Sequence, residues 1–325
     1  TIITSILIET AGGLYAGAIV LKTFIPNLVI WQTTLVLALF AGIYTAYGGL
    51  KAVVYTDCLQ AIILIFGGLV LTYILFEKID FSLETMIVSA PEGHFSIYRP
   101  INDKTLPWPG LFLGVPLLGF WYWSTNQYIV QRVLGAKDIK NARWGVLLGG
   151  FLKLIPLFIM VIPGAMAISI YSGIENPDMV YPTIVLNALP KGLIGLVLAG
   201  LISAIMSSVD STLNSSSTLV VVDFIKPKIS KISSNDIVKY GRWSTFILMI
   251  IAAVWAPMIQ YFGGIWVYLQ QMYAIFVPPI VVLFLVGVFD KKGNANGAYL
   301  TLILGTILGI IILILQQFGI WNIHF

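Results

Sequence analysis

Stretches of about 20 predominantly apolar residues, long enough to cross a bilayer as helices, recur along the whole chain. The chain is 58% hydrophobic and 10% charged, whereas a soluble domain carries about 25% charged residues. The runs are continuously apolar, unlike the alternating pattern of a transmembrane barrel strand. The sequence therefore predicts an all-α polytopic membrane protein with the lipid bilayer as its surroundings.

Nine membrane-spanning helices fit the pattern. The expected spans are Ile2–Lys22, Leu28–Tyr47, Val53–Phe76, Trp108–Gln131, Trp144–Tyr171, Gly192–Asp223, Trp243–Tyr261, Ile265–Phe289 and Gly297–Leu315. Both ends of the sequence look cut, so we expect a fragment of a longer protein. A single cysteine, Cys58, excludes a disulfide within the chain.

Basic residues are distributed unevenly between the two alternating sets of loops. Twelve of the 18 Lys and Arg fall in one set and five in the other, and Lys153 lies inside a span. The positive-inside rule places the richer set in the cytoplasm, so the first helix runs outward. The net charge of +4 thus reports orientation and does not indicate a nucleic-acid partner.

Four ionisable residues lie within expected spans, where charge is costly and commonly functional: Glu9, Asp57, Lys153 and Asp210. Lys153 lies about 13 Å into its helix, which favours a substrate or ion-pair role over snorkelling to the surface. For Asp57 we keep two alternatives, a solvated carboxylate and a cation ligand. Glu9 stays unassigned, because a structural hydrogen bond explains it equally well.

The sixth span has one polar face, formed by Ser203, Ser207, Asp210, Ser211 and Asn214. Hydroxyls stacked beside a carboxylate are hard oxygen donors that suit a small cation such as Na⁺. The alternative is close helix packing, which small polar residues also permit.

Glycine and proline interrupt the fourth span at Gly114, Pro116 and Gly119, just ahead of the segment Phe120–Gln127. Interrupted helices near mid-membrane are a recurring device for exposing backbone to substrate. The aromatic rings and amides that follow, Asn126 included, suit the faces and hydroxyls of a sugar. Gln270 adds an uncharged donor and acceptor ahead of the Pro278-Pro279 kink, and packing is its alternative role.

Several segments, in the same order along the chain, resemble the sodium/glucose cotransporter branch of the solute:sodium symporter family. They are Tyr44–Gln60, Leu106–Gly110, Trp121–Trp123 leading to Gln127–Arg132, and the serine-rich stretch that ends at Asn214-Ser215. The likeness extends along essentially the whole chain, which makes it more specific than any single motif.

The resemblance implies a LeuT-type core of two inverted five-helix repeats. Residues 1–325 would form a single transmembrane transporter domain, in which residues 1–76 supply the last three helices of the first repeat, residues 108–289 the second repeat, and residues 297–325 one additional helix. The first two core helices would be missing. The family also implies an integral plasma-membrane location, or the cell inner membrane in a bacterium, with Na⁺ as coupling ion and no cofactor.

The resemblance also implies site residues. A sodium site falls on the backbone oxygen of Ala204 and the hydroxyls of Ser207 and Ser208. A second cation site, present in some relatives, falls on Asp57, Ser207, Asp210 and Ser211, although Asp210 stands where a hydroxyl or small residue is expected. Substrate contacts fall on Lys153 and Gln270, with Tyr122 as inner gate and Trp123 beside it, and Asn126 joins this set.

The function implied is sodium-coupled symport of a monosaccharide resembling glucose or galactose into the cytoplasm by alternating access. Three alternatives remain: symport of myo-inositol or another small polar solute, a sugar sensor that does not transport, and an enzyme. The enzyme is disfavoured because no pair of nucleophile and base is evident in the sequence.

Overall fold

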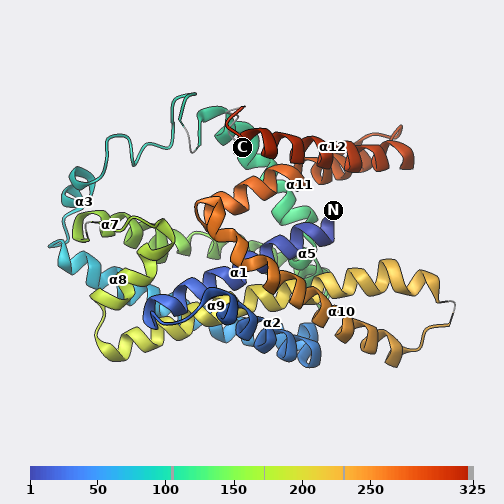
Figure 1. Ribbon diagram of the computed structural model, residues 1–325, viewed down its shortest axis with the longest axis horizontal. Helices are drawn as coiled ribbons and strands as arrows, with labels where there is room; N and C mark the ends of the chain where they lie inside the picture. The colour runs from blue at the N-terminus through green and yellow to red at the C-terminus, as the bar shows by residue number, and fades with distance from the viewer. Residues whose placement is uncertain (104–105, 172, 230, 321–325) are drawn as a thin grey trace.

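The computed structural model describes residues 1–103, 106–171, 173–229 and 231–320, and their regular structure is helical (Figure 1). The α-helices are α1 (Ile2–Phe24), α2 (Ile30–Lys78), α3 (Leu83–Ser89), α4 (Val115–Phe120), α5 (Gln127–Leu134), α6 (Ile139–Leu152), α7 (Ile162–Ile170), α8 (Val180–Ala188), α9 (Lys191–Leu219), α10 (Ser234–Trp255), α11 (Ile265–Phe289) and α12 (Ala295–Gln317). Residues 321–325, at the end of the expected C-terminal segment, lie outside the described residues.

Short helical segments of other types extend or interrupt these helices. The π-helical turns are η1 (Gly110–Gly114), η2 (Trp121–Thr125), η3 (Leu157–Val161) and η5 (Val220–Ile225). The 3-10 segments are η4 (Pro177–Met179), η6 (Lys226–Lys228) and η7 (Ala256–Phe262).

Eight segments among the described residues are long and apolar enough to cross a membrane, which confirms a multi-pass helical protein. The eighth expected span, Ile265–Phe289, coincides with α11. The expected fourth span, Trp108–Gln131, is not among the eight, because it is divided into η1, α4, η2 and α5.

The second and third expected spans form one continuous helix, α2, of 49 residues. We had expected a loop between Tyr47 and Val53, so that boundary was wrong. Helix α2 still contains two candidate spans, Ile30–Tyr47 and Val54–Lys78. At 1.5 Å per residue, a helix of this length greatly exceeds the hydrocarbon thickness of about 30 Å.

The core forms around α1, which packs against α2, α9, α10 and α11 (Figure 1). Ala11, Leu14 and Ala18 of α1 have no exposed surface. A Cβ atom placed on Gly13 would lie 3.0 Å from Val209 of α9, so the missing side chain permits close approach of the two helices. Val209 lies on the side of α9 opposite its polar face, so α1 packs against the apolar side of α9.

A second close contact joins α2 to the π-turn η3. The Thr72 hydroxyl of α2 donates to the Phe158 carbonyl at 2.7 Å. One turn earlier, a Cβ atom on Gly68 would lie 2.5 Å from Cβ of Ile159, a side chain that is 2% exposed. This packing leaves no room for a methyl group at Gly68.

We therefore expect Gly68→Ala to lower the free energy of unfolding by about 1–3 kcal/mol, because overpacking a tight contact forces side chains or backbone to shift. Thermal unfolding of the complete protein in detergent measures this change. Gly195→Ala on α9 is the matched control, since its Cβ would meet no atom within 4 Å; we expect it to be neutral or stabilising by up to about 1 kcal/mol. Equal stability of the two variants would contradict the α2–η3 contact.

Candidate functional site

The expected interruption of the fourth span is present, but the backbone leaves the helical region after the expected positions Gly114, Pro116 and Gly119. The backbone changes from α to π hydrogen bonding at η1, ahead of Pro116, and leaves the helical region only at Asn126, where ψ is 116°. The N–H of Asn126 donates to the Trp121 carbonyl at 2.9 Å, which closes the π-turn η2. The chain then enters α5, so the break directly follows the aromatic run.

Four of the five expected substrate residues line one cavity of about 610 Å³, a size within the usual range for small-molecule sites. They are Tyr122, Trp123, Lys153 and Gln270. The Lys153 ammonium lies 4.5 Å from the Tyr122 ring centroid and 6.0 Å from that of Trp123. Lys153 reaches this position because α6 ends there, three residues before Pro156.

Asn126, the fifth expected substrate residue, does not line this cavity. Its side chain is 2% exposed and donates through Nδ2 to Glu9 Oε1 of α1 at 3.4 Å. The structure therefore places Asn126 behind the cavity wall rather than on it. Tyr273, which sequence reasoning missed, does line the cavity, and it donates its hydroxyl to the same Glu9 oxygen at 3.1 Å.

The expected sodium ligands lie within little more than one turn of α9. Ser208 is exposed, and its hydroxyl donates to the Ala204 carbonyl at 3.2 Å. That hydroxyl would have to rotate for the Ala204 oxygen to face an ion. Ser207 lies close enough to the Asp57 carboxylate of α2 to interact with it, so it adjoins both expected cation sites. The assignment of these residues to sodium stays a prediction.

The second expected cation site contains an arginine. Arg132 at the end of α5 pairs with Asp57 Oδ2 at 2.6 Å, and the same guanidinium nitrogen donates to the Ser211 hydroxyl. Asp210 is 1% exposed and accepts the Thr45 hydroxyl at 2.8 Å. The guanidinium thus provides positive charge between two groups that we had assigned to a cation.

Sequence reasoning counted Arg132 only as a loop charge that sets orientation. A signal for its inward position was available, since Arg132 directly follows a span and Asp57 lies about one turn inside the same side of the membrane. Opposite charges at similar depth pair readily in a membrane protein.

The N-terminal end of α11, the helix that carries Gln270 and Tyr273, is anchored by Asp178 of η4. Both carboxylate oxygens accept the Ile265 N–H, at 3.2 and 3.0 Å, and this contact satisfies a free donor at the helix start. Burial raises the pKa of Asp178, and the Ile265 hydrogen bond opposes that shift. The segment between α7 and α9 therefore fixes where α11 begins.

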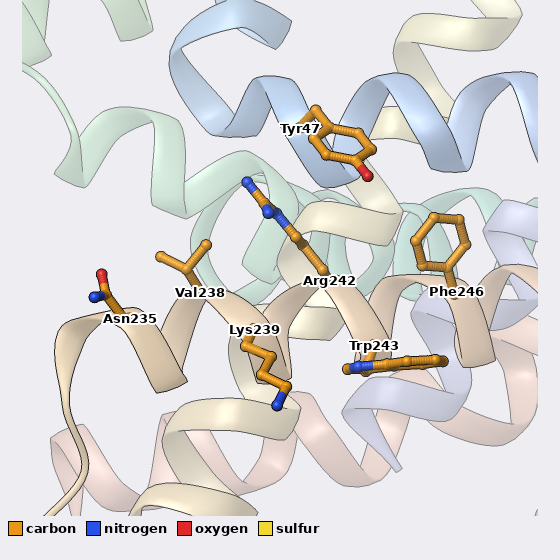
Figure 2. A pocket seen from close by; sticks show the side chains of 7 residues that line it. All are labelled: Tyr47, Asn235, Val238, Lys239, Arg242, Trp243 and Phe246. Carbon is orange, nitrogen blue, oxygen red and sulfur yellow. The ribbon is translucent and has the colours of Figure 1, made fainter.

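A separate cavity of about 550 Å³ lies at the start of α10 (Figure 2). Arg242 extends toward α2, where its guanidinium carbon is 4.7 Å from the Tyr47 ring centroid, while Lys239 points the other way (Figure 2). The two cavities share no lining residue, so we leave this one outside the candidate site.

Comparison with known proteins gives consistent matches. The model of the sodium:solute symporter family matches residues 1–305. Human sodium/myo-inositol cotransporter 2 is 34% identical over 93% of this chain and 50% of its own length. Mouse sodium/glucose cotransporter 4 is 32% identical over 97% of this chain and 51% of its own length. The chain therefore spans about half the length of the curated relatives it matches.

A solved structure of a Na⁺-coupled sialic acid symporter, in a substrate-bound outward-open state, superposes with a TM-score of 0.80. The match covers 99% of this chain and 69% of that chain at 20% sequence identity. At this identity the likeness concerns the fold, and it confirms the helical transporter architecture.

Proposed function

The chain belongs to the sodium:solute symporter family, and from that premise we propose that the complete protein couples inward movement of Na⁺ to uptake of a small polyhydroxylated solute, a monosaccharide such as glucose or galactose. It is a membrane transporter and not an enzyme. The observation that carries the proposal is the cavity in which Tyr122, Trp123, Lys153 and Gln270 converge.

The chemistry of this cavity supports a neutral polyol. Aromatic rings pack against the C–H faces of a sugar, and the Gln270 amide offers both a donor and an acceptor to hydroxyl groups. Lys153 is the one charged residue among the lining residues, and its charge is already directed at the Tyr122 ring. A hydroxyl-rich solute can accept hydrogen bonds from this ammonium without bringing a charge of its own.

Myo-inositol is the second candidate solute. Relatives named sodium/myo-inositol cotransporter 2 match this chain at 33–34% identity, as closely as those named sodium/glucose cotransporter 4, at 32%. Both solutes are rings rich in hydroxyl groups, and the same cavity chemistry suits them equally.

Sodium would be held by oxygens of α9, with Ser207 and Ser208 as hydroxyl ligands and Ala204 as a carbonyl ligand. Hydroxyl and carbonyl ligands bind a hard monovalent cation without adding charge, so they can release it in each cycle. Rearrangement at the Asn126 break, beside Tyr122, would then open the inner side of the cavity. No cofactor enters this scheme.

The test is uptake of labelled glucose, galactose and myo-inositol into proteoliposomes that contain the complete protein, with an inward Na⁺ gradient compared with choline. We expect uptake that requires Na⁺ for at least one of the three. Uptake driven by a proton gradient alone would overturn sodium coupling. Solute-evoked currents without accumulation would support a sensor instead.

Lys153→Ala should weaken apparent solute affinity about tenfold, because hydrogen bonds from a charged group contribute about 1.5–3 kcal/mol. The concentration dependence of uptake measures this change. Lys140→Ala is the matched control, since Lys140 lies on α6, the helix that Lys153 caps, is exposed, and does not line the cavity. An affinity unchanged in Lys153→Ala would remove Lys153 from the solute site.

A further inference from the structure

Three polar side chains meet inside the membrane region, directly behind the solute cavity. Glu9 lies eight residues along α1, about 10 Å from the start of that helix. Its Oε1 accepts both the Tyr273 hydroxyl of α11, at 3.1 Å, and Nδ2 of Asn126, at 3.4 Å. The cluster therefore joins α1, α11 and the break before α5.

The donors and acceptors in this cluster do not balance. Glu9 Oε2 and Asn126 Oδ1 are both buried, and neither has a hydrogen-bond partner among the described residues. Asn126 stands at the N-cap of α5, where asparagine commonly accepts a backbone N–H, yet its side chain makes no capping bond. Two unpartnered acceptors on adjacent groups indicate a missing donor, because buried polar atoms are rarely left unpaired.

We propose that Glu9, Asn126 and Tyr273 form a proton-binding site behind the wall of the solute cavity, and that a proton on Glu9 keeps this wall in the arrangement described above. The proton occupies Oε2 and supplies the donor that Asn126 Oδ1 lacks. The carboxyl and the amide already meet through Oε1 and Nδ2, and a protonated carboxyl can pair with an amide through both atoms of each group at once. One proton therefore satisfies both orphaned oxygens.

A proton fits this cluster better than a sodium ion. Hard metal cations gather about six oxygen ligands, and the cluster offers two unpartnered oxygens among the described residues. No cationic side chain of the described residues pairs with Glu9. The ion pairs found among those residues are Arg132–Asp57 and Arg99–Asp103. An ionised Glu9 would therefore have no cationic side chain to pair with in the membrane interior, which is costly.

Titratable groups that face Glu9 are phenols, Tyr273 from α11 and Tyr128 from α5. Tyr268, also on α11, donates to the neighbouring Ile8 carbonyl at 3.4 Å. Segments α8, η7 and α11 carry no acidic, basic or histidine residue. Four charged groups on the other elements packed against α1 have partners of their own: Asp57 pairs with Arg132, Asp210 with Thr45, Arg242 with Ala46 and Asp178 with Ile265.

The site is connected to the cavity through Tyr273. This residue lines the cavity beside Gln270, and its ring centroid lies 4.9 Å from that of Trp121. Loss of the proton would leave Glu9 Oε2 and Asn126 Oδ1 as two facing acceptors at the helix break. The repulsion would displace Asn126 and Tyr273, and with them the cavity wall. The N-terminus of α5, with its partial positive charge, lies beside the same carboxyl and makes release of the proton feasible.

Infrared difference spectroscopy of the complete protein, in sodium-free buffer and without solute, tests the proton directly. We expect a protonated-carboxyl C=O band that disappears at alkaline pH and is absent from Glu9→Gln. Glu77→Gln, at an exposed carboxyl near the end of α2, should retain that band. A band missing in the native protein at every pH would overturn the proposal. So would a band that Na⁺ removes at constant pH, because it would indicate a metal cation site.

The effect on the cavity is tested separately with whichever solute the protein carries. Apparent affinity for the solute should fall at least about fivefold when the pH rises from about 6 to about 8.5. A change of this size is typical of two coupled sites. Glu9→Gln retains an oxygen for Tyr273 and gains an N–H for Asn126, so it should keep the affinity of the acidic state at both pH values. A Glu9→Gln variant as pH-sensitive as the native protein would overturn the link to the cavity. The infrared test stands even if none of the tested solutes is carried.

Discussion

Replacing Ser208 by alanine should raise the Na⁺ concentration needed for half-maximal uptake at least about tenfold, and this loss would correspond to about 1.4 kcal/mol of ion binding. The reason is the position of its hydroxyl on α9. Ser208 is exposed, and its hydroxyl donates a hydrogen bond to the Ala204 carbonyl. The lone pairs of the hydroxyl oxygen therefore remain free to bind a cation. Alanine retains the helix and removes the proposed ligand. Uptake measured at increasing Na⁺, with constant solute, gives the shift.

Thr218→Ala is the matched control for Ser208→Ala. Thr218 is exposed on the same helix and makes the same type of bond, from its hydroxyl to the carbonyl four residues earlier, at 2.8 Å. This control should leave the Na⁺ dependence unchanged, whereas Ser208→Thr should largely preserve it because the hydroxyl remains. Equal shifts in Ser208→Ala and Thr218→Ala would mean that the loss arises from α9 itself and not from a sodium ligand.

Much of the helical framework could be predicted from the sequence, because the bilayer fixes both the length and the polarity of a span. Helix α11 begins and ends where hydropathy placed it, and α1 extends only two residues beyond the expected Lys22. The loop expected between Tyr47 and Val53 was wrong. The intervening residues include two glycines and Lys51, and neither residue type prevents a helix from continuing, since glycine costs only about 1 kcal/mol there.

Residues of the candidate site could be predicted where a sequence motif identifies them. Their positions could not be predicted where contacts between residues distant in the sequence decide the geometry. Tyr122, Trp123, Lys153 and Gln270 were recognised from residue types and resemblance, and they line one cavity. Asn126 was expected on the cavity surface, yet it turns to Glu9, which is 117 residues away in the sequence. Helical periodicity describes the faces of one helix and contains no information about which face of another helix it meets.

Arg132 is expected to stabilise the protein, because its removal leaves the partly buried Asp57 carboxylate unpaired. The Arg132 side chain is 32% exposed and that of Asp57 19% exposed, so the pair is intermediate between surface and buried ion pairs. We expect Arg132→Ala to lower the free energy of unfolding by about 2 kcal/mol, between the values for exposed and fully buried pairs. Thermal unfolding of the complete protein in detergent measures the loss.

The physical cause is distinguished by adding Asp57→Asn to Arg132→Ala. If the unpaired charge causes the loss, the double variant is more stable than Arg132→Ala alone, and the cycle gives a coupling energy of about 1–3 kcal/mol. Asp210 strengthens this expectation, because it is buried and close enough to Asp57 to interact with it, so Asp57 without Arg132 would face a second acid and, among the described residues, no cation. Arg143→Ala, at an exposed arginine of α6, should change stability little. If the stability losses of the two single variants simply add in the double variant, the ion pair does not contribute to stability. The contribution of Arg132 would then come only from its packing and its hydrogen bond to Ser211.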